Sequence, residues 1–322
     1  IFVVNYLKNS PSIIDKYYTI YLYNFISEAN SFIFSGIDFP IGEILYLVII
    51  VTILYFLYKA FSFKLNDLTN LFSLISIIYF LFYSLWGLNY FRTSISEILN
   101  IKSDYKFVEL DYAIDEIINK IEEETLLIEK NKDNKSVSNI FELTNTINSN
   151  IKKSILPDIF LYQKVSGHYI PFTSEAIIVE EIPIVDIPIV IYHEQAHQNG
   201  FADEAEASFI AFYKSINNKN SFIRYSGYFN ALLNLLNEVT RNHPEKLEYY
   251  MSKLNNKVRL DIKNVQNFWS KYSDNFFDKI GNYIYDFYLK SNSQESGILT
   301  YKKVSIYIID YYQRDRLSNF FN

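Results

Sequence analysis

The sequence predicts a predominantly helical α+β protein in which an apolar helical hairpin precedes a larger helical domain. Two long stretches early in the chain lack charged residues almost entirely. Through most of the remainder, apolar residues recur at helical spacing, and one aromatic and β-branched segment interrupts that pattern at residues 168–179. We therefore divide the chain into an N-terminal segment at 1–40, a hairpin at 41–92 and a domain at 93–322.

The predicted hairpin consists of two segments long enough to cross a bilayer. Residues 41–58 contain one charged residue, Glu43, and residues 68–91 contain none. A helix of about twenty apolar residues spans the hydrocarbon core of a membrane. The link between the segments is short, so they should lie antiparallel, with Trp86 and Arg92 as interfacial anchors at the far end. The alternative is a pair of buried helices in a soluble core, because several serines dilute the second segment.

The charges that flank the hairpin nearly balance. Lys59 and Lys64 in the link favour a cytoplasmic link, whereas Arg92, Lys102 and Lys106 after the second segment oppose that orientation. The count of positive charges alone therefore does not orient the chain.

Beyond the hairpin, most of the chain should be helical. Apolar residues from Leu110 to Ile128 recur at helical spacing in an acidic stretch, which predicts an amphipathic helix with a solvated charged face. Residues 131–150 are polar and rich in Asn and Ser, so we expect a loop or a marginal helix there. Residues 247–268 predict another long helix, which should begin at Pro244.

The segment at 168–179 is the one clear candidate for β-structure. Its end, Glu175 to Val179, predicts a strand just before the next helix. Such a strand could offer its edge to an extended peptide, or it could be a plain core strand. His168, at the start of the segment, is a candidate for stabilising an oxyanion, although a lone histidine in an aromatic turn is more often structural.

The residues that follow form the sequence His193-Glu194-Gln195-Ala196-His197, an HExxH motif. Histidines four residues apart on a helix project from one face, so both imidazoles can bind one metal ion while Glu194 faces its water. Pro188 suits the first turn of this helix, and Gly200 suits a left-handed turn at its end. The pattern is typical of zinc hydrolases, and the alternative is an accidental pair of surface histidines.

A catalytic zinc ion usually has three protein ligands, so a third is expected. Three carboxylates lie within reach along the chain, at Asp203, Glu204 and Glu206. Asp203 and Glu206 also form an Asp-x-x-Glu capping box at the start of a second helix, which gives both a structural role. We therefore prefer Glu204, followed by Ala207 at the spacing that gluzincins show, and keep Glu206 and Asp203 as alternatives.

These residues resemble a family of bacterial membrane proteins described as domain of unknown function 3810, whose members look like zincin-type metallopeptidases. The resemblance covers nearly the whole chain, and its motifs are Trp86-Gly87-Leu88-Asn89-Tyr90, Tyr169-Ile170-Pro171-Phe172-Thr173-Ser174-Glu175-Ala176, the stretch from His193 to Phe209, and Tyr288-Leu289-Lys290-Ser291-Asn292. Two positions depart from the family pattern: Gln195 stands where Leu is usual, and Ser208 stands where Asn is usual. The second departure puts a contact to a metal ligand in doubt.

The resemblance implies a zincin-like domain placed outside the cytoplasm and anchored in the bacterial cell membrane. It also implies a further hydrophobic helix ahead of the hairpin. We accordingly expect residues 1–40 to hold the end of a truncated first transmembrane helix, at Ile1 to Val4, followed by a loop.

Composition narrows the class of function. The net charge is -6 and no basic run occurs, so nucleic acid is not an expected partner. The chain has no cysteine, which excludes thiolate ligands and cysteine nucleophiles.

The sequence thus predicts a membrane-anchored zinc metallopeptidase. Its partners would be the lipid bilayer and a peptide or protein substrate, with Zn²⁺ held by His193, His197 and Glu204, and Glu194 as general base. The competing hypothesis is a non-catalytic membrane protein with a structural zinc ion or a peptide-binding zincin-like domain.

Overall fold

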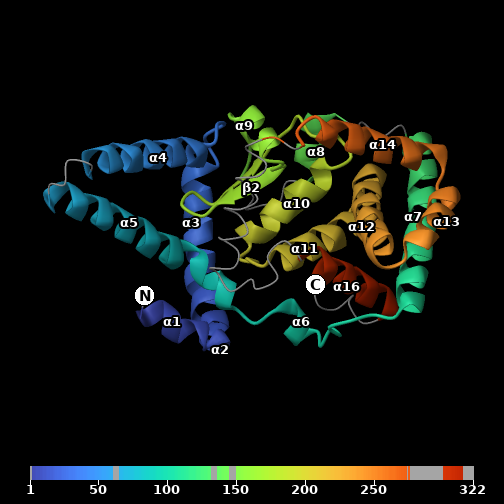
Figure 1. Cartoon of the computed structure of the whole chain (residues 1–322), viewed down its shortest axis with the longest axis horizontal. Coiled ribbons are helices and arrows are strands. Elements are labelled where there is room, and N and C mark those ends of the chain that lie inside the picture. Colours follow the sequence, from blue (N-terminus) through green and yellow to red (C-terminus); the bar gives the residue numbers. More distant parts are fainter. Residues whose placement is uncertain are drawn as a thin grey trace.

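The computed structural model describes residues 2–60, 65–131, 136–144, 150–273, 275 and 300–314. These residues are predominantly helical and include a small three-stranded mixed sheet, which confirms the predicted α+β class. A hairpin of two helices projects from one end of the molecule, and the sheet and the remaining helices form the other part (Figure 1). The stretch Tyr288 to Asn292, which contributes to the family resemblance, lies outside the described residues.

The hairpin consists of α4 (Ile41–Ala60) and α5 (Leu65–Leu85), which pack side by side. The predicted pair of apolar helices is confirmed, and both have the length and composition of a membrane-crossing helix. The second helix is shorter than we expected, because residues Gly87–Phe91 form a separate 3-10 helix, η2. A tertiary contact explains the difference: the chain leaves the helix after Leu85, and the Trp86 side chain is buried in the domain.

Helices also make up most of the N-terminal segment, and our expectation of a loop there was wrong. The segment contains α1 (Phe2–Lys8), α2 (Pro11–Ile13), the π-helix η1 (Ile14–Tyr23) and α3 (Asn24–Phe34). The last three run without a break from 11 to 34. One face of this helix buries Ile14, Tyr18 and Tyr23 against Trp86 and Phe91, a long-range contact that stabilises it.

The sheet has the strand order β1-β3-β2, formed by β1 (Ile151–Lys153), β2 (Gly167–Ile170) and β3 (Glu175–Ile178). β1 is parallel to β3, and β2 is antiparallel to it. The predicted strand at 175–179 is therefore present as β3, but it is the central strand and fully buried. Of the two roles that we considered for this strand, a peptide-binding edge or a core strand, the structure shows the core strand. Among the described residues, the neighbouring β2 is an edge strand.

The rest of the domain is a set of packed helices. The predicted amphipathic helix is α7 (Phe107–Asn131), and the region we expected to be a loop or marginal helix contains α8 (Val137–Thr144). The helix predicted after Pro244 is instead η3 (Pro244–Lys246), α13 (Leu247–Lys253) and α14 (Asn256–Ser270), because Asn255 caps a new helix by accepting from Val258 N. The remaining helices are α6 (Ile95–Ile98), α9 (Pro157–Tyr162), α10 (Ile187–Gln198), α11 (Glu204–Ile216), α12 (Ser221–Asn242) and α16 (Thr300–Gln313).

Two buried charged residues of the sheet fix the start of α4 to the domain. The Glu175 carboxylate is fully buried and accepts hydrogen bonds from Ile41 N at 3.1 Å and Gly42 N at 2.5 Å. Lys152 lies 3.6 Å from the same carboxylate and donates to the backbone carbonyls of Phe34 and Ile37. A carboxylate at a helix N-terminus also interacts favourably with the helix dipole. The hairpin is therefore joined to the sheet through a paired and hydrogen-bonded junction.

This junction predicts the result of a double-mutant cycle. Glu175→Gln should lower the free energy of unfolding by about 3–5 kcal/mol, because it leaves the buried Lys152 ammonium without its counter-charge. In the double variant Glu175→Gln, Lys152→Met the loss should be smaller than the sum of the single losses. Thermal unfolding in detergent gives the free energy of unfolding of the wild type, the two single variants and the double variant. Additive losses would show that the two side chains do not act as a pair.

Candidate metal centre

The HExxH motif occupies the last two turns of α10, which is buried along most of its length. The chain reverses just after this helix at Gly200, whose φ of +79° is the left-handed conformation that glycine adopts most readily. A Cβ at this position would also lie 2.9 Å from the ring of Tyr23. The reversal brings α11 back along α10, so that the first residue of α11 faces the two histidines.

Three side chains converge at this reversal: His193, His197 and Glu204. The Nε2 atoms of the histidines are 3.1 Å apart, and Glu204 Oε2 lies 3.2 Å from His193 Nε2 and 3.6 Å from His197 Nε2. The side chains of His193 and Glu204 are 21% and 20% exposed, whereas that of His197 is 7% exposed. The cluster is therefore largely buried but accessible to solvent on one side.

The outer nitrogen of each imidazole has its own hydrogen-bond partner. His197 Nδ1 is 2.7 Å from the carbonyl oxygen of Phe201, and His193 Nδ1 is 3.2 Å from Ser208 Oγ. A carbonyl can only accept, so His197 carries a proton on Nδ1 and its Nε2 faces the cluster. Ser208 thus makes the contact to His193 that its departure from the family pattern had put in doubt.

Electrostatics in this cluster favour a cation. Burial opposes ionisation of Glu204, but the adjacent imidazoles outweigh it and hold the pKa of Glu204 well below its ordinary value. Burial also opposes a charge on His197, yet Glu204 outweighs burial and raises the pKa of His197 to about 9. An ionised carboxylate beside two imidazole nitrogens calls for a positive charge among them, supplied by a proton or by a metal ion.

The other two candidate carboxylates have structural roles. Asp203 is the N-cap of α11, accepting from Ala205 N and Glu206 N at 3.0 Å each, and it also binds Lys303 at 2.8 Å. Glu206 is buried and accepts from Ile95 N at 2.6 Å. The predicted cap is therefore present at Asp203, whereas Glu206 reaches a distant segment. Of the three carboxylates, only Glu204 belongs to the cluster that could hold a metal ion.

Glu194 lies beside this cluster, against the edge strand. It is 5% exposed, and burial raises the pKa of Glu194 above its ordinary value although both imidazoles oppose the rise. A Cβ on Gly167 of β2 would lie 3.0 Å from Glu194 Oε1. Glycine at this position of β2 therefore allows the strand to approach the Glu194 carboxylate closely.

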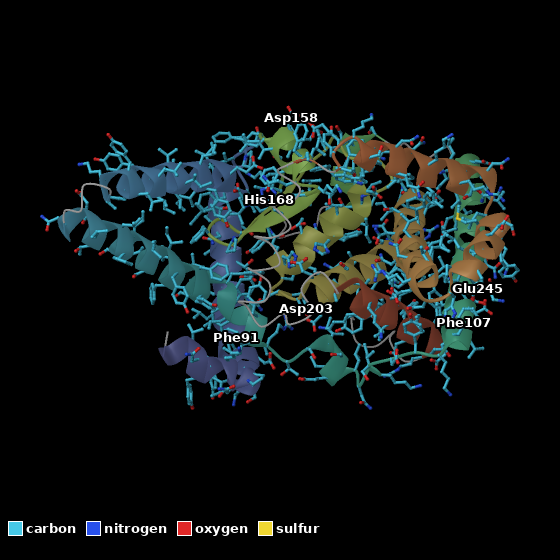
Figure 2. All side chains as sticks on the ribbon, viewed as in Figure 1. Phe91, Phe107, Asp158, His168, Asp203 and Glu245 are labelled. Carbon is cyan, nitrogen blue, oxygen red and sulfur yellow. The ribbon has the colours of Figure 1, made fainter. Side chains whose placement is uncertain are left out.

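His168 lies on the same strand but contacts a different group. His168 and Asp203 both lie in the middle of the molecule, near α10 (Figure 2). His168 Nε2 is 3.3 Å from Glu43 Oε1 near the start of α4, and its ring stacks on Phe160 at 4.2 Å between centroids. The structure thus gives His168 a structural partner, and its predicted role at an oxyanion stays a prediction.

The end of the motif helix is held by residues that we had expected elsewhere or had not singled out: Trp86 and Arg92 were expected at a membrane interface, and Tyr23 had no expected role. Tyr23 donates to Gln198 O at 2.7 Å, Trp86 Nε1 donates to His197 O at 3.0 Å, and Arg92 donates to Gly200 O at 3.0 Å. The last carbonyls of a helix have no partner within it, so Tyr23 and Trp86 complete the C-terminal end of α10, while Arg92 holds the turn that follows it. Trp86 also belongs to a stretch that carries the family resemblance, but neither that stretch nor its place after an apolar segment indicated a contact with the motif helix.

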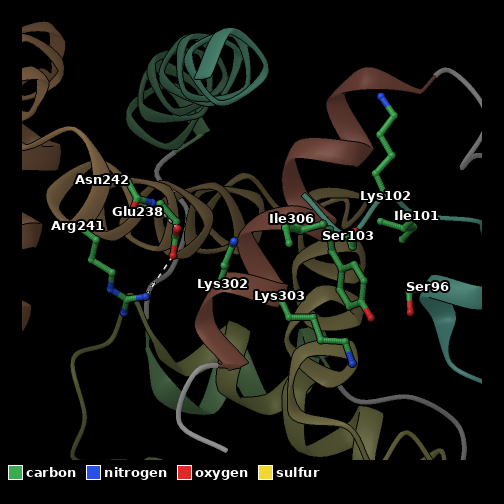
Figure 3. A pocket seen from close by; sticks show the side chains of 11 residues that line it. Ser96, Ile101, Lys102, Ser103, Glu238, Arg241, Asn242, Lys302, Lys303 and Ile306 are labelled. Carbon is green, nitrogen blue, oxygen red and sulfur yellow. Dashed lines mark hydrogen bonds and ion pairs between the residues drawn. The ribbon is translucent and has the colours of Figure 1, made fainter. Parts of the chain in front are cut away.

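A separate cavity of about 580 Å³ lies between α6, α12 and α16 (Figure 3). No member of the histidine and glutamate cluster lines it. Its basic side chains include Arg241 and Lys303, which are paired with Glu238 at 3.2 Å and with Asp203 at 2.8 Å. Among the described residues that line the cavity there is no comparable set of metal ligands, so we place the candidate site at the cluster.

Together, the fold and the cluster define a helical protein with an apolar hairpin and a candidate metal centre. The chain belongs to the family described as "Protein of unknown function (DUF3810)", whose model matches residues 18–309. This confirms the family resemblance that the sequence motifs indicated. No curated protein and no solved structure matches the chain.

The cluster predicts a specific pattern of metal content in purified variants. His193→Ala with His197→Ala should remove bound zinc, and Glu204→Gln should weaken its binding strongly, because each change removes a ligand atom. Asp203→Asn is the matched control: asparagine still caps a helix, so this variant should retain zinc. Elemental analysis by mass spectrometry, with circular dichroism to check the fold, measures the outcome. Full zinc in the double histidine variant would contradict the assignment.

Proposed function

We propose that the chain is a membrane-anchored, zinc-dependent peptidase with a zincin-like catalytic domain. The observation that carries the proposal is the spacing of the three ligand atoms. Nitrogen and oxygen ligands at about 2.0–2.2 Å from a tetrahedral zinc ion are about 3.3–3.6 Å from one another. The three distances here are 3.1, 3.2 and 3.6 Å, which are close to the separations expected for three ligands of one tetrahedral ion and support the proposal.

Zinc fits this donor set for two further reasons. Imidazole and carboxylate are ligands that zinc commonly takes in catalytic sites, where a fourth position is kept for water. The contacts of His197 to Phe201 O and of His193 to Ser208 orient both rings, as the outer partners of metal-binding histidines usually do. When bound, zinc would supply Lewis acidity, which lowers the pKa of a water molecule and polarises a carbonyl group.

The protein's own contribution to catalysis would come from Glu194. Its carboxylate lies beside the cluster in a buried position, and burial raises the pKa of Glu194 in the direction that favours a group able to carry a proton. In the proposed reaction Glu194 accepts a proton from the attacking water and later donates it to the amine of the departing peptide. His193, His197 and Glu204 hold the metal and take no part in this proton transfer.

The edge strand supports a peptide as the substrate. β2 pairs with β3 on one side, and among the described residues no strand pairs with its other side. An extended peptide can add to such an edge through backbone hydrogen bonds. The close approach of Gly167 to Glu194 would bring a peptide bound there next to the proposed general base.

The hairpin supports a location in the bacterial cell membrane. Helices of 20 and 21 residues rise about 30 Å, the thickness of a hydrocarbon core, and their side chains are largely exposed instead of packed in a core. We propose that the catalytic domain lies outside the cytoplasm, with Lys59 near the end of α4 on the inner side. The non-catalytic alternative, a structural zinc ion, is disfavoured because His193 and Glu204 remain partly exposed to solvent.

The proposed mechanism predicts that Glu194→Gln separates metal binding from catalysis. The variant should retain zinc and the fold but lose peptide hydrolysis by at least about a hundredfold, because the amide cannot accept the proton. Hydrolysis of a broad peptide library by the full chain in detergent measures this, and Glu181→Gln, which changes an exposed glutamate outside the cluster, is the control. Equal activity of wild type and Glu194→Gln would exclude Glu194 as the general base.

A further inference from the structure

The continuous helix at 11–34, formed by α2, η1 and α3, carries a stripe of exposed apolar residues. Its members recur at four-residue and then seven-residue intervals: Ile13, Tyr17, Tyr21, Phe25 and Phe32. In a helix that is part π and part α, this spacing keeps them on one face. Tyr21, Phe25 and Phe32 are 68%, 69% and 87% exposed. A large exposed aromatic patch of this kind usually marks an interaction surface.

The contacts of this helix place it at the level where the hairpin meets the domain. Tyr18 donates to the carbonyls of Tyr83 and Ser84, in the last turn of α5. At its other end, Phe34 precedes the first residue of α4 by a short turn that Lys152 holds against the sheet. The helix therefore connects the bases of both apolar helices, and α3 lies crosswise to them (Figure 1).

We propose that the helix at 11–34 lies in the membrane interface, with the aromatic stripe against the lipid. The proposal rests on the membrane anchoring by α4 and α5 proposed above. If those helices cross the bilayer, their bases lie near its surface, and a helix that connects the two bases runs along that surface. Tyrosine and phenylalanine on the outer face, with Lys16 beside them, are typical of helices that bind at the boundary of headgroups and acyl chains.

The opposite face of the same helix contacts the C-terminal end of α10, the helix that carries His193 and His197. Tyr23 donates to Gln198 O at 2.7 Å, and Ser27 donates to the same carbonyl at 3.3 Å. A helix with its side chains is about 10–12 Å across. The metal-binding end of α10 is therefore fixed about one helix diameter from the bilayer surface, where it can reach membrane-proximal segments of a substrate.

Single spin labels on the full chain test the proposal directly, because the chain contains no cysteine and each label is unique. The probes are Tyr21→Cys and Phe25→Cys, reconstituted in vesicles of phosphatidylcholine and phosphatidylglycerol. Val51→Cys on α4 serves as the lipid reference and Leu260→Cys on α14 as the aqueous reference, since both residues are exposed. Power saturation then compares access to oxygen, which enters lipid, with access to a water-soluble nickel complex.

Labels at 21 and 25 should be accessible to oxygen and protected from nickel by at least about fivefold relative to position 260. Access to nickel equal to that at position 260, with Val51 still in lipid, would overturn the interfacial helix while leaving the anchor intact. Protection from both reagents would show a protein contact, such as a second copy of the chain, and would also overturn it. Access of nickel to Val51 would refute the membrane anchor and the interfacial helix together.

Discussion

The rest of the structure depends on the hydrogen bonds made to the backbone carbonyls at the C-terminal end of α10. The last carbonyls of any helix lack partners within the helix, and those of α10 lie in a largely buried place. Tyr23 and Trp86 donate to the carbonyls of Gln198 and His197, and Arg92 donates to that of Gly200 in the turn that follows; all three come from the N-terminal third of the chain. The same segment that connects the apolar hairpin to the domain therefore also fixes the position of His197. The candidate metal centre and the hairpin are parts of one packed unit.

A second constraint is the charge collected at the reversal between α10 and α11. Two imidazoles and an ionised carboxylate meet within hydrogen-bonding distance, and Glu194 adds a second carboxyl group next to them. Ser208 and the carbonyl of Phe201 hold the rings with their inner nitrogens toward Glu204. The cluster is built from short-range contacts of two consecutive helices. The relative positions of its side chains are fixed by the turn at Gly200 and by the residues that pack on that turn.

These origins explain how much could be predicted from the sequence. The pairing of His193 with His197 follows from helical spacing, and the structural role of Asp203 follows from local capping, so the choice of Glu204 rested on local rules. The two apolar helices could likewise be predicted from the sequence, because both segments almost entirely lack charged residues. By contrast, the end of α5 at Leu85, the helix at 11–34 and the partner of Glu206 depend on contacts between residues far apart in the chain. Local periodicity carries no information about such contacts.

The sheet illustrates the same limit. The composition of residues 175–179 predicts a strand, but only the pairing of β3 with both neighbours shows that β2 is the edge. The junction of Glu175 and Lys152 with the start of α4 was hidden for the same reason, since these residues are separated by more than a hundred positions from the backbone groups that they bind.

X-ray absorption spectroscopy at the zinc edge of the purified full chain tests the proposed function most directly. The proposal predicts one zinc ion with two imidazole nitrogens, one carboxylate and one water oxygen at about 2.0–2.2 Å. A zinc ion enclosed by four protein ligands would contradict it, because no position would remain for the water from which Glu194 is proposed to take a proton.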